Sequence, residues 1–276
     1  MSTWLITGCS TGLGRALAEA VLDAGNNAVV TARDEGTLTE IAEKYPASAL
    51  ALPLDVRDLE QGVAVVEQAI DRFGGVDVLV NNAGHGYRSA IEEAAPAEVN
   101  ELFETNFFGP VNLMRQVLPG MRQRRSGTII NVSSIAGRRS SPGSGYYSAT
   151  KSALEAASDA LRKEVAPLGV RVVVVEPGAF RTDFAGRSLL QAAVPIGDYA
   201  STAGQRRKEN DHTHGTQAGD PARAAQAFIT VAEADNPPFR ILFGTDALAV
   251  VRTELENQRN EIDAWEKLSR STDYPA

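Results

Sequence analysis

Cysteine and histidine are scarce in this sequence: Cys9 is the only cysteine, and there are three histidines among 276 residues. A lone cysteine excludes an internal disulfide and suits a reducing compartment, so we expect a cytoplasmic protein. Two of the histidines, His212 and His214, lie close together in a polar segment, which is too few ligands for a metal site. We therefore expect no bound metal.

Long apolar runs and an excess of positive charge are missing as well. No run approaches ~18 residues, which a membrane-spanning helix needs, and the first residues lack the pattern of a signal peptide. The net charge of -8 argues against nucleic acid as a partner. Hydrophobic residues make up 43% of the chain, and no linker, repeat or low-complexity tract is visible. We expect one domain over residues 1–276.

Seven apolar stretches alternate with amphipathic ones, which predicts strands alternating with helices. The apolar stretches lie at residues 3–7, 27–33, 49–56, 76–84, 127–134, 170–177 and 238–244. Such alternation is typical of the α/β class, in which helices flank a doubly wound parallel sheet.

Three glycines follow the first predicted strand within TGCSTGLG, namely Gly8, Gly12 and Gly14. Glycine lets the backbone turn tightly and lets a pyrophosphate approach the N-terminus of the next helix, where free amides favour anions. The strand, turn and helix together predict a dinucleotide site, although the glycines alone would also fit a plain turn.

Tyr147 and Lys151 are four residues apart in a segment that we predict to be helical, residues 144–169. Both side chains therefore lie on one face of that helix, and Ser134 ends the strand before it. A phenol has a pKa near ~10, and a neighbouring cation lowers that pKa. The three groups suit proton transfer to or from an alcohol oxygen. An isolated YxxxK pattern also occurs by chance on surface helices.

Four motifs follow one another along the chain: TGxxxGxG after the first strand, NNAG at residues 81–84, YxxxK at 147–151 and PGxxxT at 177–182. As a set they resemble the classical short-chain dehydrogenase/reductase family over about residues 3–245. The resemblance implies a Rossmann-type sheet of about seven strands in the order 3-2-1-4-5-6-7. It also implies an enzyme that interconverts an alcohol and a ketone or aldehyde by hydride transfer.

The resemblance assigns four catalytic residues. Tyr147 is expected to be the general acid and base, and Ser134 is expected to orient the substrate oxygen. Lys151 is expected to lower the pKa of the tyrosine and to hold the nicotinamide ribose. Asn106 is expected to hold a water through its backbone.

The resemblance also implies a cofactor site, in which Asp55 would bind the adenine amino group unless it caps the next helix. A guanidinium at Arg33 suits the 2′-phosphate of NADP(H), whereas members that use NAD(H) tend to have an acidic residue there. Because Asp34 could pair with Arg33, NADP(H) is favoured and NAD(H) stays open. The expected cofactor-binding residues are Gly8, Ser10, Thr11, Gly12, Leu13, Gly14, Arg33, Asp55, Val56, Asn82, Ala83, Gly84, Tyr147, Lys151, Pro177, Gly178, Phe180 and Thr182.

Two later segments bear on substrate and packing. Residues from about 185 to 219 are polar and irregular, and in the family this region forms a lid over a small-molecule alcohol or carbonyl substrate. His85 and Tyr87 either face that substrate or lie on the surface. Residues of about 246–269 predict an amphipathic helix that packs on the domain or on a partner.

A long predicted helix, residues 96–125 with an interruption at Gly109 and Pro110, precedes the Tyr147 helix. In the family these two helices commonly form a subunit interface, so we expect a homodimer or homotetramer with closed symmetry. The apolar residues expected at that interface are Leu102, Val111, Leu113 and Leu118.

Two alternatives to this enzyme stay open. A non-catalytic regulator that senses NADP(H) would have the same fold, because fold does not fix function. An epimerase or dehydratase of the extended short-chain family is disfavoured by the glycine spacing and by the modest length.

Overall fold

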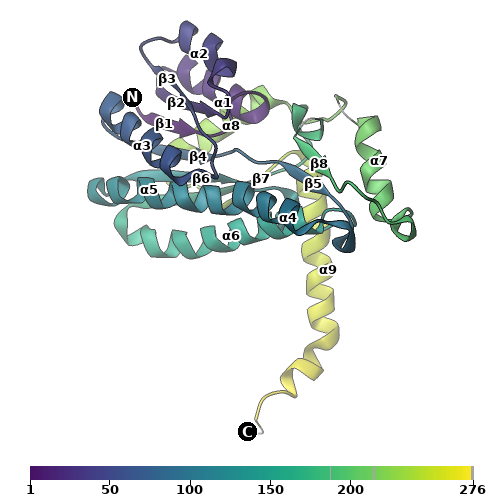
Figure 1. The fold of residues 1–276 in the computed structure, drawn as a ribbon. Helices are drawn as coiled ribbons and strands as arrows, with labels where there is room; N and C mark the ends of the chain where they lie inside the picture. Colours follow the sequence, from purple (N-terminus) through teal and green to yellow (C-terminus); the bar gives the residue numbers. More distant parts are fainter. Residues whose placement is uncertain (187, 214, 275–276) are drawn as a thin grey trace.

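Seven parallel strands form the central sheet of the computed structural model, which describes residues 1–186, 188–213 and 215–274 (Figure 1). Their spatial order is β3-β2-β1-β4-β6-β7-β9. Numbered among themselves, the seven strands have the order 3-2-1-4-5-6-7, so the predicted fold class and strand order are confirmed. The strands are β1 (Thr3–Ile6), β2 (Asn27–Ala32), β3 (Ala49–Pro53), β4 (Val78–Asn81), β6 (Gly127–Val132), β7 (Val170–Pro177) and β9 (Arg240–Phe243).

The central strands are continuous apolar runs. β6 and β7 pair in parallel from Gly127 opposite Val170 to Val132 opposite Val175, and almost all of their side chains are buried. A parallel strand covered on both faces needs apolar side chains on both sides, so its sequence does not alternate. The run of valines in β7 meets that requirement.

Helices cover both faces of the sheet (Figure 1). On one face α1, α2 and α8 enclose a core that contains Trp4 and Phe228. On the other face α3, α5 and α6 enclose a core that contains Leu5 and Met121. The helices are α1 (Gly12–Asp23), α2 (Thr39–Lys44), α3 (Leu59–Phe73), α5 (Gly109–Arg124), α6 (Gly145–Val165) and α8 (Pro221–Glu233).

The long helix predicted before Tyr147 is divided. α4 (Pro96–Phe103) leads into a π-helical turn, Glu104–Phe108, and α5 begins at Gly109. The irregularity thus starts five residues before the predicted Gly-Pro interruption. A Cβ on Gly109 would lie 2.8 Å from the carbonyl oxygen of Val56, so the helix approaches that loop too closely for a side chain. π-turns frequently mark functional sites, and this one holds Asn106 in the interior.

The segment predicted to be irregular, about 185–219, contains regular structure. β8 (Leu189–Gln191) pairs in parallel with β5 (Gly86–Arg88), and α7 (Ala203–Thr213) follows. β5, β8 and α7 lie together to one side of the main sheet (Figure 1). Strands of three residues are too short to show a period, and α7 lacks an apolar stripe. His214 lies outside the described residues.

The C-terminal helix α9 (Thr245–Arg270) projects from the rest of the fold (Figure 1). Ala247 and Val251 near its start are buried, whereas Leu255 and Trp265 are 49% and 61% exposed. The prediction that this helix packs on the domain is therefore confirmed for its first turns, and packing of the remainder on a partner stays a prediction. Across the described ranges, every helix is too short or too polar to cross a bilayer.

The predicted interface residues occupy different environments. Leu102 and Leu113 are 0% and 2% exposed because they lie inside the core of this chain, so the prediction that they form a subunit interface is wrong. Val111 and Leu118 are partly buried against the same core. Assembly into a homodimer or homotetramer stays a prediction.

Candidate active site

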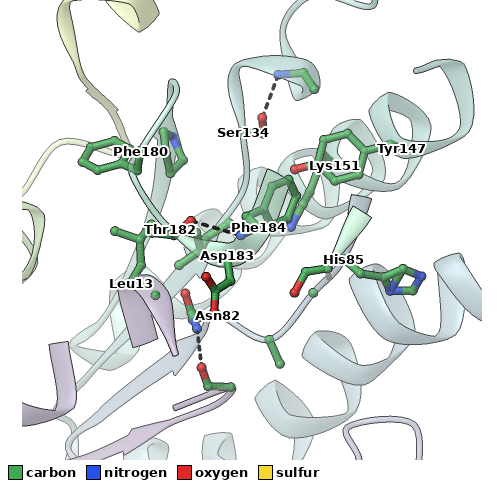
Figure 2. A pocket seen from close by; sticks show the side chains of 18 of the residues that line it. Leu13, Asn82, His85, Ser134, Tyr147, Lys151, Phe180, Thr182, Asp183 and Phe184 are labelled. Atoms are coloured by element: carbon green, nitrogen blue, oxygen red, sulfur yellow. Dashed lines mark hydrogen bonds between the residues drawn. The ribbon is translucent and has the colours of Figure 1, made fainter. Parts of the chain in front are cut away.

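A cavity of about 1120 Å³ lies at the carboxyl ends of the parallel strands, where open α/β sheets bind their ligands (Figure 2). Every residue expected from the sequence lines it except Gly14 and Asn106, which lie directly behind its wall. The structure therefore brings together residues that are up to about 170 positions apart in the chain, from Gly8 to Thr182.

The glycine turn between β1 and α1 forms one end of the cavity. Gly8 and Gly12 have φ angles of 73° and 63°, in the left-handed region that favours glycine. A Cβ on Gly14 would lie 2.3 Å from the carbonyl oxygen of Gly8. The side-chain amide of Asn82, which directly follows β4, donates to the carbonyls of Thr7 at 2.8 Å and Gly8 at 3.2 Å and so holds the turn in place (Figure 2).

Thr7 was not among the expected site residues, although it begins the TGxxxGxG motif. Its buried hydroxyl accepts hydrogen bonds from the backbone N–H groups of Asn82 at 3.0 Å and Ala83 at 2.9 Å. These two hydrogen bonds connect the residues that follow β4 to the end of β1, so the polar groups after both strands lie side by side at the edge of the sheet. The threonine at the start of the TGxxxGxG motif is the sequence signal from which this role could have been predicted.

The tip of β2 carries Arg33, which is exposed and faces the cavity. The carboxylate of Asp34 accepts from the backbone N–H of Gly36 at 3.0 Å, and no ion pair joins it to Arg33 in the described part of the chain. The alternative in which Asp34 neutralises Arg33 therefore loses its support. The arginine at this strand end stays accessible to an anion.

Asp55 lies at the neighbouring strand end. Its carboxylate is 2.6 Å from the guanidinium of Arg57, and this bond lowers the pKa of Asp55. The alternative prediction that Asp55 caps a helix does not hold, because Asp58 caps α3 by accepting from the N–H groups of Glu60 and Gln61.

Ser134, Tyr147 and Lys151 converge on the other end of the cavity (Figure 2). Ser134 follows β6, and its hydroxyl accepts from the backbone N–H of Ala136 at 3.1 Å. Tyr147 and Lys151 lie one turn apart on α6 and are 6% and 5% exposed. The ammonium of Lys151 donates to the carbonyl of Val132 at 2.9 Å and lies 5.9 Å from the centre of the Tyr147 ring.

Burial controls the protonation of this group. It raises the pKa of Tyr147, while a hydrogen bond with Ser134 and the charge of Arg88 act in the opposite direction. It lowers the pKa of Lys151 to about 8, against the nearby charge of Glu155. Arg88 is thus one cation whose charge lowers the pKa of Tyr147, and the role of Lys151 in lowering that pKa stays a prediction.

Asn106 holds the loop after β4 from inside. Its side-chain amide donates to the carbonyl of His85 at 2.9 Å and to the hydroxyl of Thr150 at 3.3 Å, and its oxygen accepts from the N–H of His85 at 3.0 Å. The predicted water on its backbone stays a prediction. His85 lines the cavity, whereas Tyr87 is buried beside it and donates to Glu98.

A family model described as short chain dehydrogenase matches residues 2–192. The chain belongs to the short-chain dehydrogenase family. A crystal structure of a short-chain dehydrogenase from Streptomyces avermitilis has a TM-score of 0.92 and 42% identity, over 99% of this chain and 100% of that chain. Oxidoreductase BOA17 of Botryotinia fuckeliana is 35% identical over 96% of this chain and 97% of its own length. The predicted family is confirmed, and the protein is an oxidoreductase of that family.

Two other similar solved structures contain nicotinamide cofactors. An alcohol dehydrogenase from Thermococcus sibiricus, complexed with 5-hydroxy-NADP, is 27% identical with a TM-score of 0.73, over 88% of this chain and 96% of that chain. A family member from Burkholderia phymatum, in complex with NAD, is 26% identical with a TM-score of 0.81, over 93% of this chain and 95% of that chain.

In this short-chain dehydrogenase the loop after β7 is held by α9. The N–H of Ala179 donates to the carboxylate of Asp246 at 2.7 Å, and a Cβ on Gly178 would lie 2.3 Å from that carboxylate. Thr182 accepts from the N–H of Phe184 at 3.3 Å. Asp246 was missed from the sequence, where it is one acidic residue in the first turn of a predicted helix.

A cluster of charged side chains lies behind the site, around the buried carboxylates of Glu155 and Glu176. The hydroxyl of Ser133 donates to Glu155 at 2.6 Å, and Arg240 lies 3.3 Å from Glu155 and 3.4 Å from Glu176. Burial and the charge of Glu155 raise the pKa of Glu176, while Arg138, at 3.3 Å, opposes the shift. The cluster fixes Ser133, and through it the strand end that carries the neighbouring serine.

Proposed function

We propose that this short-chain dehydrogenase interconverts an alcohol and the corresponding ketone or aldehyde with NADP(H), with Tyr147 as general acid and base. The observation that carries the proposal is the convergence of Ser134, Tyr147 and Lys151 in the cavity that also contains the glycine turn. The Thermococcus sibiricus relative, an alcohol dehydrogenase complexed with 5-hydroxy-NADP, supports both the reaction class and the cofactor.

The residues present fit a dinucleotide. Gly8, Gly12 and Gly14 leave the backbone open to a pyrophosphate at the start of α1. Arg33 at the tip of β2 suits a 2′-phosphate, since a guanidinium forms charge-assisted, bidentate hydrogen bonds. When bound, NADPH supplies the hydride. The Burkholderia phymatum complex with NAD keeps NAD(H) as the second candidate.

The chain itself supplies the proton and the orientation. In the reduction direction, the Tyr147 hydroxyl donates its proton to the carbonyl oxygen, which takes up the charge left as hydride reaches the carbon. Ser134 donates a hydrogen bond to the same oxygen and holds it in place. Lys151 and Arg88 stabilise the phenolate that remains, and the segment from about 185 to 219 acts as a lid over the substrate.

The experiment compares Tyr147→Phe with Tyr146→Phe across a panel of ketones, aldehydes and alcohols. Tyr147→Phe removes the hydroxyl and keeps the ring, so turnover should fall by at least roughly 10²-fold, with NADPH binding almost unchanged. Tyr146 is the matched control, because its hydroxyl donates to the carbonyl of Ile91 at 3.1 Å and serves packing.

Equal losses in the two variants would contradict the role of Tyr147. NADPH binding by the wild type, without turnover of any carbonyl compound or alcohol in the panel, would favour the non-catalytic regulator instead.

A further inference from the structure

Glu155 is a buried carboxylate on the helix that carries Tyr147 and Lys151, and the proposed proton transfer does not use it. The three residues lie four apart on α6, so their side chains share one face of the helix. Glu155 is 4% exposed, and its Oε1 accepts from the hydroxyl of Ser133 at 2.6 Å. Arg240 lies 3.3 Å from its Oε2 and supplies the opposite charge that a buried carboxylate needs. One oxygen of Glu155 is thus paired with a cation, and the other holds the residue that follows β6.

The turn after β6 is held by α6 on both sides of Ser134. Ser133 precedes Ser134 and donates to Glu155. On the other side, the carbonyl of Gly137 accepts from the hydroxyl of Ser152 at 2.9 Å. A Cβ on Gly137 would lie 2.2 Å from Oε1 of Glu155, so the turn approaches the carboxylate too closely for a side chain. Because one helix holds the turn at both ends and also carries the tyrosine, it fixes the Ser134 hydroxyl relative to the phenol.

We propose that Glu155 is a positioning residue for Ser134: through Ser133 it holds the turn in the arrangement in which Ser134 and Tyr147 meet the same substrate oxygen. A hydrogen bond to a carboxylate is stronger than one to a neutral acceptor, and burial strengthens it further. A misplacement of about 1 Å can lower the rate of a reaction by about 10²-fold, so a bond behind the site is enough to control turnover. This inference rests on the proposed function, because it concerns the geometry of the same site.

Two competing roles of Glu155 give different predictions. Burial lowers the pKa of Lys151 and the charge of Glu155 opposes this shift, so the carboxylate could act through the lysine instead. It could also serve stability alone, since Arg240 joins it to the buried Glu176 at the end of β7. Ser133→Ala separates these roles from positioning, because it removes the hydrogen bond and leaves the charge and the ion pair in place.

The experiment uses the full chain with NADPH, or NADH if that is the active cofactor, and the carbonyl compound that the wild type reduces fastest. A fluorescence titration with the cofactor counts the folded sites, so kcat is expressed per site and loss of folded protein does not lower it. Ser133→Ala and Glu155→Met should each lower this kcat by roughly ten- to a hundred-fold, with the KM for the cofactor almost unchanged. Glu155→Gln, which keeps an acceptor oxygen for Ser133, should retain most of the wild-type kcat. The Ser133→Ala/Glu155→Met double variant should lose no more than Glu155→Met alone, because both changes remove the same bond.

Glu164→Gln is the matched control, since Glu164 is an exposed carboxylate on the same helix, and it should leave kcat per site unchanged. A wild-type kcat per site in Ser133→Ala would overturn the inference and leave the proposed function standing; a loss in Glu155→Gln as large as that in Glu155→Met would then assign the effect to the charge near Lys151. Fewer folded sites with an unchanged kcat per site in both Ser133→Ala and Glu155→Met would overturn it as well, because the role would be one of stability. If the wild type reduces no ketone or aldehyde and oxidises no alcohol, both proposals fail.

Discussion

Replacing Lys151 with methionine should make the protein more stable and inactive. Lys151 is 5% exposed, and burial lowers its pKa from the ordinary 10.5 to about 8. At about 1.36 kcal/mol per pH unit, this difference destabilises the ammonium form by about 3 kcal/mol at neutral pH. Methionine has a similar length and no charge to desolvate.

Part of the stability that Lys151→Met gains by removing the buried charge is offset by the loss of a hydrogen bond. The ammonium donates to the carbonyl of Val132 at 2.9 Å, and a hydrogen bond to a charged group contributes about 1.5–3 kcal/mol. The free energy of unfolding of Lys151→Met should therefore exceed that of the wild type by about 1 kcal/mol at pH 7. Between pH 8 and pH 10.5 the unfolded wild-type chain binds the proton that the folded one has released, so wild-type stability rises with pH. The advantage of the variant should shrink over that window.

Urea unfolding of both proteins at pH 7, 8.5 and 10, followed by far-ultraviolet circular dichroism, tests this. Lys163→Met is the control on the same helix: Lys163 is exposed and pairs with Asp159 at 2.7 Å, a surface contact that contributes at most about 1 kcal/mol. Its effect should be small and should not follow the same pH dependence. A Lys151→Met variant that is less stable at pH 7, or equally favoured at every pH, would refute the reasoning.

Three further outcomes are expected. Arg33→Asp should lower kcat/KM for NADPH by roughly ten- to a hundred-and-fifty-fold and leave NADH equal or better, because the 2′-phosphate loses a charged partner; an unchanged preference for NADH in wild type and variant would contradict the NADP assignment. Gly14→Ala should abolish NADPH binding and lower the free energy of unfolding by at least about 1–3 kcal/mol, since its Cβ would lie 2.3 Å from the carbonyl oxygen of Gly8. Gly120→Ala is the control: its Cβ would lie 3.2 Å from the flexible end of Arg124, so this change should be neutral or stabilising by up to about 1 kcal/mol. The intact chain should sediment as a homodimer or homotetramer at micromolar concentration, because the apolar side chains on the projecting half of α9 are exposed in a single copy; a monomer would contradict this.

The strands of the main sheet could be predicted because burial on both faces demands unbroken apolar runs, as in Val172–Val175 of β7. β5 and β8 could not, because three residues show no period and their pairing joins segments about 100 positions apart. α7 could not either, since its polar sequence has no stripe from which a buried face would be predicted. Local pattern thus predicts the elements that build the core and misses those held by contacts outside it.

The site divides in the same way. Ser134, Tyr147 and Lys151 were predictable because helix geometry and motif spacing are local properties. The place of Arg88 in the cavity wall was not, because the guanidinium is held there by Ser144, which lies 56 residues further along the chain. Its sequence neighbours, in HGYRSAIEE, give no sign that the guanidinium is turned inward.

Burial also determines the protonation state of Tyr147. It raises the pKa of Tyr147 above the ordinary value of 10, against the opposing effects of the Ser134 hydrogen bond and the Arg88 charge. The phenol therefore keeps its proton at neutral pH, and this is the form that donates to a carbonyl oxygen, whereas oxidation of an alcohol needs the phenolate as the base. We therefore expect the rate of alcohol oxidation to rise with pH, because the fraction of phenolate rises, while carbonyl reduction needs no such increase.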